Sequence, residues 1–164
     1  MGKSRRQNKF IIKGEVTECY DTQGNMFLID THQLDLVKQS YWSMQTKQKY
    51  IVRPMDKKLL HRILTNCPKD KVVDHINHLK YDNRLCNLRV CSYTENQCNR
   101  VPKHNNKYEG VKGIFLHPNG KYRATIIINK KTIHLGYFNT LEEAKEKRIE
   151  AEKKYFGEFR YEQM

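Results

Sequence analysis

The pattern of apolar and polar positions divides the chain into three stretches. In the first, residues 1–57, short alternating runs predict strands at residues 10–12, 16–20, 26–29 and 50–53. A polar segment, DTQGN at residues 21–25, separates the second run from the third and predicts a hairpin. Residues 34–39 have the spacing of a short helix. This stretch is therefore expected to form a basic arm, residues 1–9, followed by a small β region.

The second stretch, residues 58–100, combines a helical pattern with a polar loop. The segment KLLHRIL at residues 58–64 has apolar residues spaced for a short helix. Val72 and Val73 look like the start of a strand, and residues 88–90 can form the returning strand across a loop rich in Asn and Asp. A helix that carries Asn96 is expected to follow.

The third stretch follows a polar linker at residues 101–109 and has the clearest alternation. Strands are predicted at residues 113–116, 122–128 and 132–138, and a long helix at residues 141–155. Thr140 and Glu143 have the spacing of a capping box, and Gly157 is suited to end the helix. Residues 110–160 are thus expected to form a three-stranded antiparallel sheet with one helix. The fold class predicted for the whole chain is α+β.

Alternation gives this C-terminal sheet two different faces. We expect the apolar face, with Ile126, Leu135 and Tyr137, to pack on the helix near Ala144 and Ala151. The opposite face and its edges carry the residues expected to contact DNA: Lys112, Lys121, Arg123, Thr125, Lys130, Lys131 and His134. A solvated basic face without a ligand is the alternative interpretation.

Charge identifies the class of partner and composition excludes others. The chain has 31 Lys and Arg against 18 Asp and Glu, a net charge of +13, which would attract a polyanion such as nucleic acid. No run of about 18 apolar residues exists, and no apolar signal-peptide core follows the basic N-terminus, so we expect a cytoplasmic protein with no membrane partner. The five cysteines are an odd number, which favours reduced thiols.

Asp74 and His75 form the sharpest chemical feature, at the end of a short apolar run. Hydrolysis of a phosphodiester needs a base to deprotonate water and positive charge on the developing phosphorane. A carboxylate can hold a hard divalent cation, and an imidazole can accept a proton near neutral pH. Alone, such a pair is more often a surface turn.

The spacing of further motifs changes that assessment. The segment DHIN at residues 74–77 is followed by DNR at residues 82–84, NLR at residues 87–89 and TENQ at residues 94–97. From about Leu60 to Arg100, the chain resembles the HNH nucleases, in the homing-endonuclease branch found in phages and mobile introns. The resemblance implies a ββα-metal fold, in which a hairpin and a helix hold one metal ion.

The resemblance also implies a role for each matching position. Asp74 would be the first metal ligand, His75 the general base, Asn87 the residue that orients this base and fixes the loop, and Asn96 the second metal ligand. The implied cofactor is one divalent ion, Mg²⁺ or Mn²⁺.

Other residues of the motif leave alternatives open. Arg84 and Arg89 could face phosphate or hold the hairpin, and His61 is expected to pack the preceding helix. His78 stands where the family usually has a turn-forming glycine, and could be a phosphate contact, a group near the metal or a tolerated loop residue. No cysteine pair has the two-residue gap of a zinc knuckle, so buried thiols are expected rather than structural zinc.

Residues 108–159 resemble the DNA-binding domain of plant ethylene-responsive transcription factors, the APETALA-two type. The matching segments are YEGV, GKYRA and HLGYF, followed by an amphipathic helix. The resemblance implies a sheet that lies in the major groove of duplex DNA, where arginine can pair with guanine. The plant domains use tryptophan and several arginines on this face, whereas this chain has Thr132 and His134 on its third strand, so its preferred bases are expected to differ.

These observations predict a metal-dependent HNH homing endonuclease. It would cut double-stranded DNA at a site located by the C-terminal domain and leave 5′-phosphate and 3′-hydroxyl ends. One alternative is a DNA-binding regulator with an inert nuclease site, and another is a nuclease that processes RNA. Cleavage of one strand or both, by a monomer or a homodimer, is open at this point.

Overall fold

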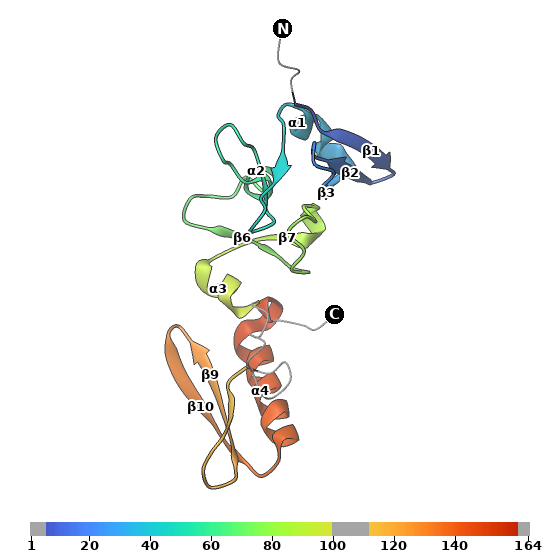
Figure 1. The fold of residues 1–164 in the computed structure, drawn as a ribbon. Coiled ribbons are helices and arrows are strands. Elements are labelled where there is room, and N and C mark those ends of the chain that lie inside the picture. The colour runs from blue at the N-terminus through green and yellow to red at the C-terminus, as the bar shows by residue number, and fades with distance from the viewer. Residues whose placement is uncertain (1–5, 100–111, 161–164) are drawn as a thin grey trace. The chain divides into compact units, whose positions relative to one another are not determined.

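The computed structural model describes residues 6–99 and 112–160, which form two compact units, residues 1–93 and 94–164 (Figure 1). Each unit combines helices with small antiparallel sheets, so the α+β class is confirmed. The first residues of the basic arm, Arg100, the linker at residues 101–109 and the YEGV motif lie outside the described residues. No helix in the described parts is long and apolar enough to cross a membrane.

The first unit begins with a three-stranded antiparallel sheet of β1 (Lys9–Lys13), β2 (Val16–Tyr20) and β3 (Met26–Asp30), in that order. The predicted hairpin between β2 and β3 is confirmed. Asp21 holds its turn, because one carboxylate oxygen accepts hydrogen bonds from the backbone N–H groups of Gln23 and Asn25, both at 2.9 Å.

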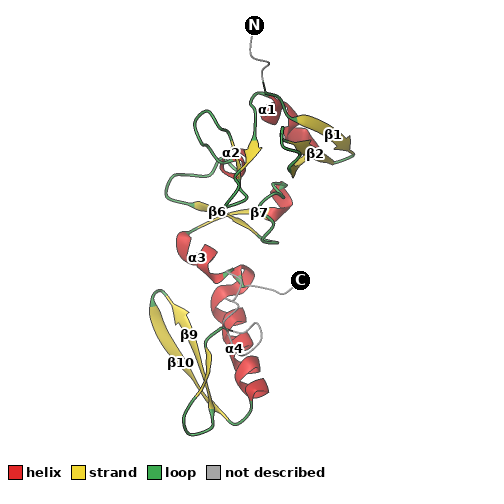
Figure 2. Ribbon diagram, viewed as in Figure 1, coloured by secondary structure: helices red, strands yellow, loops and turns green. Residues whose placement is uncertain are grey.

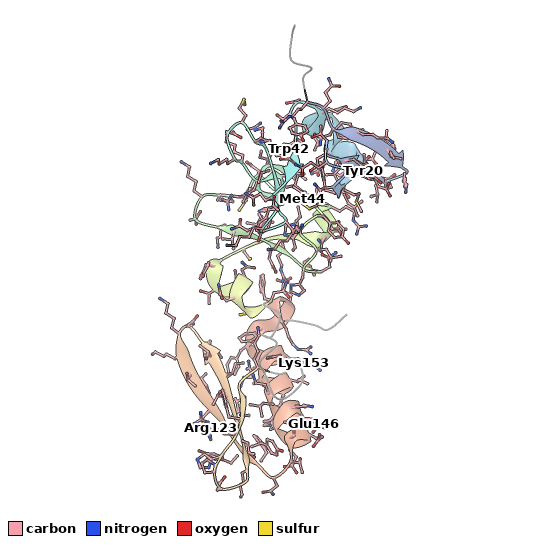
Figure 3. The ribbon with its side chains drawn as sticks, viewed as in Figure 1. Tyr20, Trp42, Met44, Arg123, Glu146 and Lys153 are labelled. Atoms are coloured by element: carbon pink, nitrogen blue, oxygen red, sulfur yellow. The ribbon has the colours of Figure 1, made fainter. Side chains whose placement is uncertain are left out.

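Short elements cover this sheet and lead to the nuclease motif. They are η1 (Thr31–Gln33), α1 (Leu34–Lys38), β4 (Ser43–Met44), β5 (Ile51–Val52) and α2 (Leu60–Leu64). Their core centres on Trp42, which is 2% exposed and donates its indole N–H to the Val37 carbonyl at 2.9 Å (Figure 3). Phe27 of the sheet and Leu60 of α2 belong to the same cluster. Residues on both sides of the expected boundary at residue 57 therefore share one core.

The hairpin of β6 (Val72–His75) and β7 (Leu88–Cys91) completes this unit, with the short helix η2 (Leu85–Asn87) before β7 (Figure 2). The loop between β6 and η2 is bound to the edge of β3. Leu28 donates its N–H to the Tyr81 carbonyl at 2.8 Å, and Asn83 donates its N–H to the Leu28 carbonyl at 2.9 Å. The N-terminal sheet thus supports the loop that follows Asp74 and His75.

The helix α3 (Tyr93–Cys98) begins at the boundary, and the second unit continues with β8 (Ile114–Leu116), β9 (Tyr122–Ile128), β10 (Lys131–Phe138), α4 (Leu141–Phe156) and η3 (Gly157–Phe159). The strands form an antiparallel sheet in the order β10-β9-β8. The predicted capping box of Thr140 and Glu143 is present, and Gly157 ends α4 with a φ of 52°. The core joins Ile114 and Ala124 of the sheet to Ala144 of α4.

One prediction for this sheet is wrong, because β10 contains a bulge. Its register with β9 shifts between His134 and Gly136, which reverses the alternation of the remaining residues. Tyr137 consequently pairs with Arg123 and is 46% exposed, whereas Phe138 packs against the core. Figure 3 shows Arg123 on the side of the sheet away from α4. Tyr137 therefore lies on the outer face with His134, and not against the helix.

Candidate active site

Asp74 and His75 are both buried at the end of β6, with 7% and 5% of their surface exposed. Asp74 lies opposite Arg89 of β7, and the guanidinium of Arg89 donates to its carboxylate at 2.6 Å. Since neighbouring residues of a strand point to opposite faces, the carboxylate and the imidazole occupy different sides of the hairpin. Arg89 compensates the charge of Asp74 within the hairpin.

The imidazole of His75 packs among other rings. The ring of His61, on α2, meets it edge to face with centroids 5.1 Å apart, and the Tyr50 ring lies 6.1 Å away. Burial lowers the pKa of His75, while the nearby Asn83 amide and the charges of Asp74 and Asp82 act in the opposite direction. The ring is thus neutral at neutral pH and can accept a proton.

His61 is a second buried imidazole beside the first. Burial, with the neighbouring His75 imidazole and the positive charges of Arg62 and Lys80, lowers the pKa of His61 to about 3. Its ring also packs against that of Tyr50, with the centroids 5.1 Å apart and the planes tilted by 57°. His61 therefore stays neutral. It lies buried on α2, as expected, and it also contacts the ring of His75.

Asn87 ties the two ends of the loop together. Its side-chain oxygen accepts from the Asn77 N–H at 2.9 Å, and its side-chain amide donates to the Asp82 carbonyl at 2.8 Å. Its own carbonyl accepts from the N–H of Ile76 at 2.9 Å. These bonds fit the part of the expected role that concerns the loop, and they fix the backbone immediately after His75.

Asp82, to which the sequence alone assigned no role, anchors the centre of the loop. The carboxylate is 2% exposed and accepts two hydrogen bonds from the Arg84 guanidinium, at 2.7 and 2.6 Å, and one from the Asn77 amide at 2.9 Å. Burial raises the pKa of Asp82, but the bonds and charge of Arg84 and the Asn77 bond outweigh it and leave the pKa lowered. Arg84, like Arg89, is thus engaged by a carboxylate of the hairpin, which favours the interpretation that both arginines hold it.

His78 adopts the backbone conformation that explains the glycine usual in the family. Its φ is 63°, in the left-handed region that favours glycine, and its N–H donates to the His75 carbonyl at 3.0 Å. The turn therefore forms with histidine in place of glycine. The choice between a phosphate contact, a group near the metal and a tolerated loop residue stays open.

The oxygen donors proposed for a metal suit a hard cation. Asp74 offers a carboxylate, and Asn96, half-buried on α3 in the second unit, offers an amide oxygen. Both are ligand types that Mg²⁺ and Mn²⁺ accept. Within residues 6–99 and 112–160, no group of three or more His, Cys, Asp or Glu side chains could hold a metal ion. Water and phosphate oxygens would have to complete the coordination of a bound ion.

Lys80 and Tyr50 were not identified from the sequence, although they lie close to this site. The Lys80 ammonium is 4.4 Å from the centre of the Tyr50 ring and donates to the Gln48 carbonyl at 3.1 Å. Lys80 stands inside the DHIN–DNR motif, which could have drawn attention to it. Tyr50 precedes the motif and belongs to a different hairpin, so no sequence signal connects it with His75.

The outer face of the C-terminal sheet mixes cations and rings. The Arg123 guanidinium lies 5.5 Å from the Phe115 ring, and the Tyr137 ring lies 4.8 Å from that of His134. The lysines expected to contact DNA are exposed at the sheet edges (Lys121, Lys130 and Lys131) or half-buried (Lys112). Thr125 differs from them, because it is buried and its hydroxyl donates to the Gly113 carbonyl at 3.2 Å. Thr125 pairs with His134 on the outer face, but little of its surface is exposed there.

Comparisons with known proteins point to the same segment of the chain. Residues 66–98 match a protein family model described as HNH endonuclease, and this segment contains Asp74, His75, Asn87 and Asn96. An uncharacterized HNH endonuclease of Acanthamoeba polyphaga mimivirus is 26% identical over 143 residues, which cover 84% of this chain and 74% of that protein. No solved structure matches significantly. Residues 66–98 accordingly correspond to an HNH endonuclease domain, and the two comparisons support endonuclease activity for this chain.

Proposed function

We propose that this protein is a metal-dependent homing endonuclease that hydrolyses phosphodiester bonds in double-stranded DNA. The observation that carries the proposal is the buried, neutral imidazole of His75 beside the carboxylate of Asp74, at the start of a loop that Asn87 ties together. A neutral imidazole at such a position is a suitable general base for water.

In the proposed reaction, His75 takes a proton from the water that attacks phosphorus. The imidazolium that forms is stabilised by the groups that oppose the effect of burial on its pKa, namely Asn83, Asp74 and Asp82. The new bond joins the water oxygen to phosphorus, and the bond from phosphorus to the 3′ oxygen breaks, which leaves 5′-phosphate and 3′-hydroxyl ends. A divalent ion held by Asp74 and Asn96 would supply positive charge to the phosphorane and the leaving oxygen.

The second unit is proposed to choose the site of cutting, with a domain at residues 110–160 separate from the nuclease domain at residues 58–100. Its outer sheet face combines Arg123 and His134 with exposed lysines at the turns. Cations on one face bind DNA phosphates in a salt-dependent manner, and an arginine in the major groove can recognise guanine.

Supercoiled plasmid provides the direct test. Wild-type protein with Mg²⁺ or Mn²⁺ should convert it to nicked or linear DNA, and EDTA should prevent this. The nicked form would indicate cleavage of one strand, and direct formation of the linear form cleavage of both. His75→Ala should abolish cutting while DNA binding persists, whereas a matched control, His32→Ala, should cut normally because His32 is exposed on η1.

Three results would contradict parts of the proposal. Wild-type protein that binds plasmid but leaves it intact with each of several divalent ions would be a DNA-binding regulator. Faster cleavage of an RNA duplex than of DNA with the same sequence would make RNA the substrate. Unchanged affinity and site preference after removal of residues 108–164 would exclude the second unit as the reader.

A further inference from the structure

Lys80 is a cation whose head group is already held in place. Its ammonium lies 4.4 Å over the ring of Tyr50 and donates one hydrogen bond, at 3.1 Å, to the carbonyl of Gln48. Both partners precede β5, so they approach Lys80 from a hairpin distant in sequence. Ordering a lysine side chain costs conformational entropy. These contacts meet much of that cost before any ligand binds.

The backbone around Lys80 is also held from both directions. The carbonyl of Leu79 accepts from the Asp82 N–H at 2.9 Å, and the carbonyl of Tyr81 accepts from the Leu28 N–H of β3 at 2.8 Å. The Asn83 amide donates to the carbonyl of Lys80 itself at 3.4 Å. The side chain therefore extends from a fixed point of the same loop that follows His75.

Tyr50 connects this ammonium with the proposed general base. The Tyr50 ring is 6.1 Å from the ring of His75 and 5.1 Å from that of His61. Lys80 is thus close enough to His75 to influence chemistry there.

Lys80 differs from the two arginines of the hairpin in the charge that it retains. Arg84 and Arg89 are each bonded to a carboxylate, of Asp82 and Asp74 respectively. In the described parts of the chain, no carboxylate lies within ion-pair distance of the Lys80 ammonium. A carbonyl and a ring face orient this ammonium without neutralising it, and an ammonium has three N–H donors.

We propose that Lys80 is a catalytic residue that binds a non-bridging oxygen of the scissile phosphate, with Tyr50 and Gln48 as its positioning residues. This inference rests on the proposed nuclease function. Negative charge on the non-bridging oxygens changes as water attacks, and a preorganised donor aimed at this charge favours the transition state over the bound substrate. Lys80 would be this donor, with its positive charge facing the phosphate oxygens.

Single-turnover cleavage at saturating enzyme tests the catalytic role, because it separates the rate of the bound complex from affinity. Lys80→Met keeps the aliphatic stem and should cut roughly 100-fold more slowly, as expected for loss of one transition-state donor. Lys80→Arg should recover most of the rate. Lys69→Met, a matched control at an exposed lysine of the same unit, should match wild type. Unfolding followed by Trp42 fluorescence should show that all variants are folded.

The salt dependence of DNA binding, measured in EDTA, is a second readout that does not need cleavage. Loss of one phosphate contact should reduce the slope of log affinity against log salt by about 0.9 for Lys80→Met and leave it unchanged for Lys69→Met. If Lys80→Met reduced the slope but wild type did not cut DNA, the phosphate contact of Lys80 would stand and the nuclease proposal would be rejected. A wild-type cleavage rate in folded Lys80→Met would overturn the catalytic role, and an unchanged slope would overturn the contact.

Discussion

Replacing Arg84 with methionine separates the two interpretations of this arginine, as a clamp of the hairpin or as a phosphate contact. The substitution keeps the unbranched stem and removes the guanidinium, which makes two hydrogen bonds to Asp82 at 2.7 and 2.6 Å. Asp82 would keep its bond from the Asn77 amide, at 2.9 Å, and a long one from the backbone N–H of residue 84, at 3.4 Å. A carboxylate that is 2% exposed would then lack its counter-charge.

The cost follows from burial on the two sides of the pair. Removing one partner of a fully buried ion pair destabilises a protein by about 3–5 kcal/mol. The Arg84 side chain is 33% exposed, so water can reach part of the gap, and the expected loss is about 2–3 kcal/mol. For a unit of this size, this loss corresponds to a melting temperature lower by roughly 10–20 °C.

Trp42 makes the measurement specific to the first unit. It is the single tryptophan of the chain and is buried in the core of that unit, so its fluorescence reports unfolding of residues 1–93. Urea titration of Arg84→Met should show a lower midpoint than wild type. Adding Asp82→Asn should recover part of the loss, because the uncompensated charge is then absent. Lys13→Ala, which removes an exposed ion pair with Glu18, should leave the midpoint unchanged.

A wild-type urea midpoint for Arg84→Met would refute the clamp. If the variant also bound DNA more weakly, with a smaller salt slope, Arg84 would be a phosphate contact, as the other interpretation holds.

Three further predictions concern pH and the second unit. The pKa of Asp82 is lower in the folded protein than in the unfolded chain, where it is about 3.9, so the ionised carboxylate stabilises the fold above that pH. This contribution should be lost as the pH falls through the folded pKa. Asp82→Asn should therefore flatten the acid side of a plot of stability against pH. Gly113→Ala should destabilise the second unit by more than about 2 kcal/mol, seen by circular dichroism, because its Cβ would lie 2.3 Å from the Thr125 carbonyl oxygen at a φ of +77°. Lys130→Gly should raise the stability of that unit by about 0.5–1 kcal/mol in thermal unfolding, since Lys130 has a φ of 64° in a two-residue hairpin turn.

Local signals in the sequence explain the features that could be predicted. The hairpin at residues 21–25 depends on its own turn residues, and α4 depends on the Thr140 capping box and Gly157. The segments around Asp74 and Asn87 could be recognised because a catalytic loop imposes its spacing on a short stretch of chain.

The features that were missed depend on contacts between distant segments. The ring cluster of Tyr50, His61 and His75 joins three elements, and no periodicity connects them. The face of Tyr137 was mispredicted because strict alternation has no place for the extra residue that the bulge inserts. The bonds between β3 and the loop use backbone groups, which leave no trace in residue identity.

Those backbone bonds between Leu28, Tyr81 and Asn83 also define the smallest portable cutting module. A chimera that joins residues 6–99 to a different DNA-binding domain keeps the support of the loop together with Asn96, and should keep its cutting chemistry while it acquires a new target. A chimera that starts at residue 58 loses β3 and the core around Leu60, so its loop would have to be held by other means. The functional boundary for protein engineering therefore lies well upstream of the residues by which the nuclease motif is recognised.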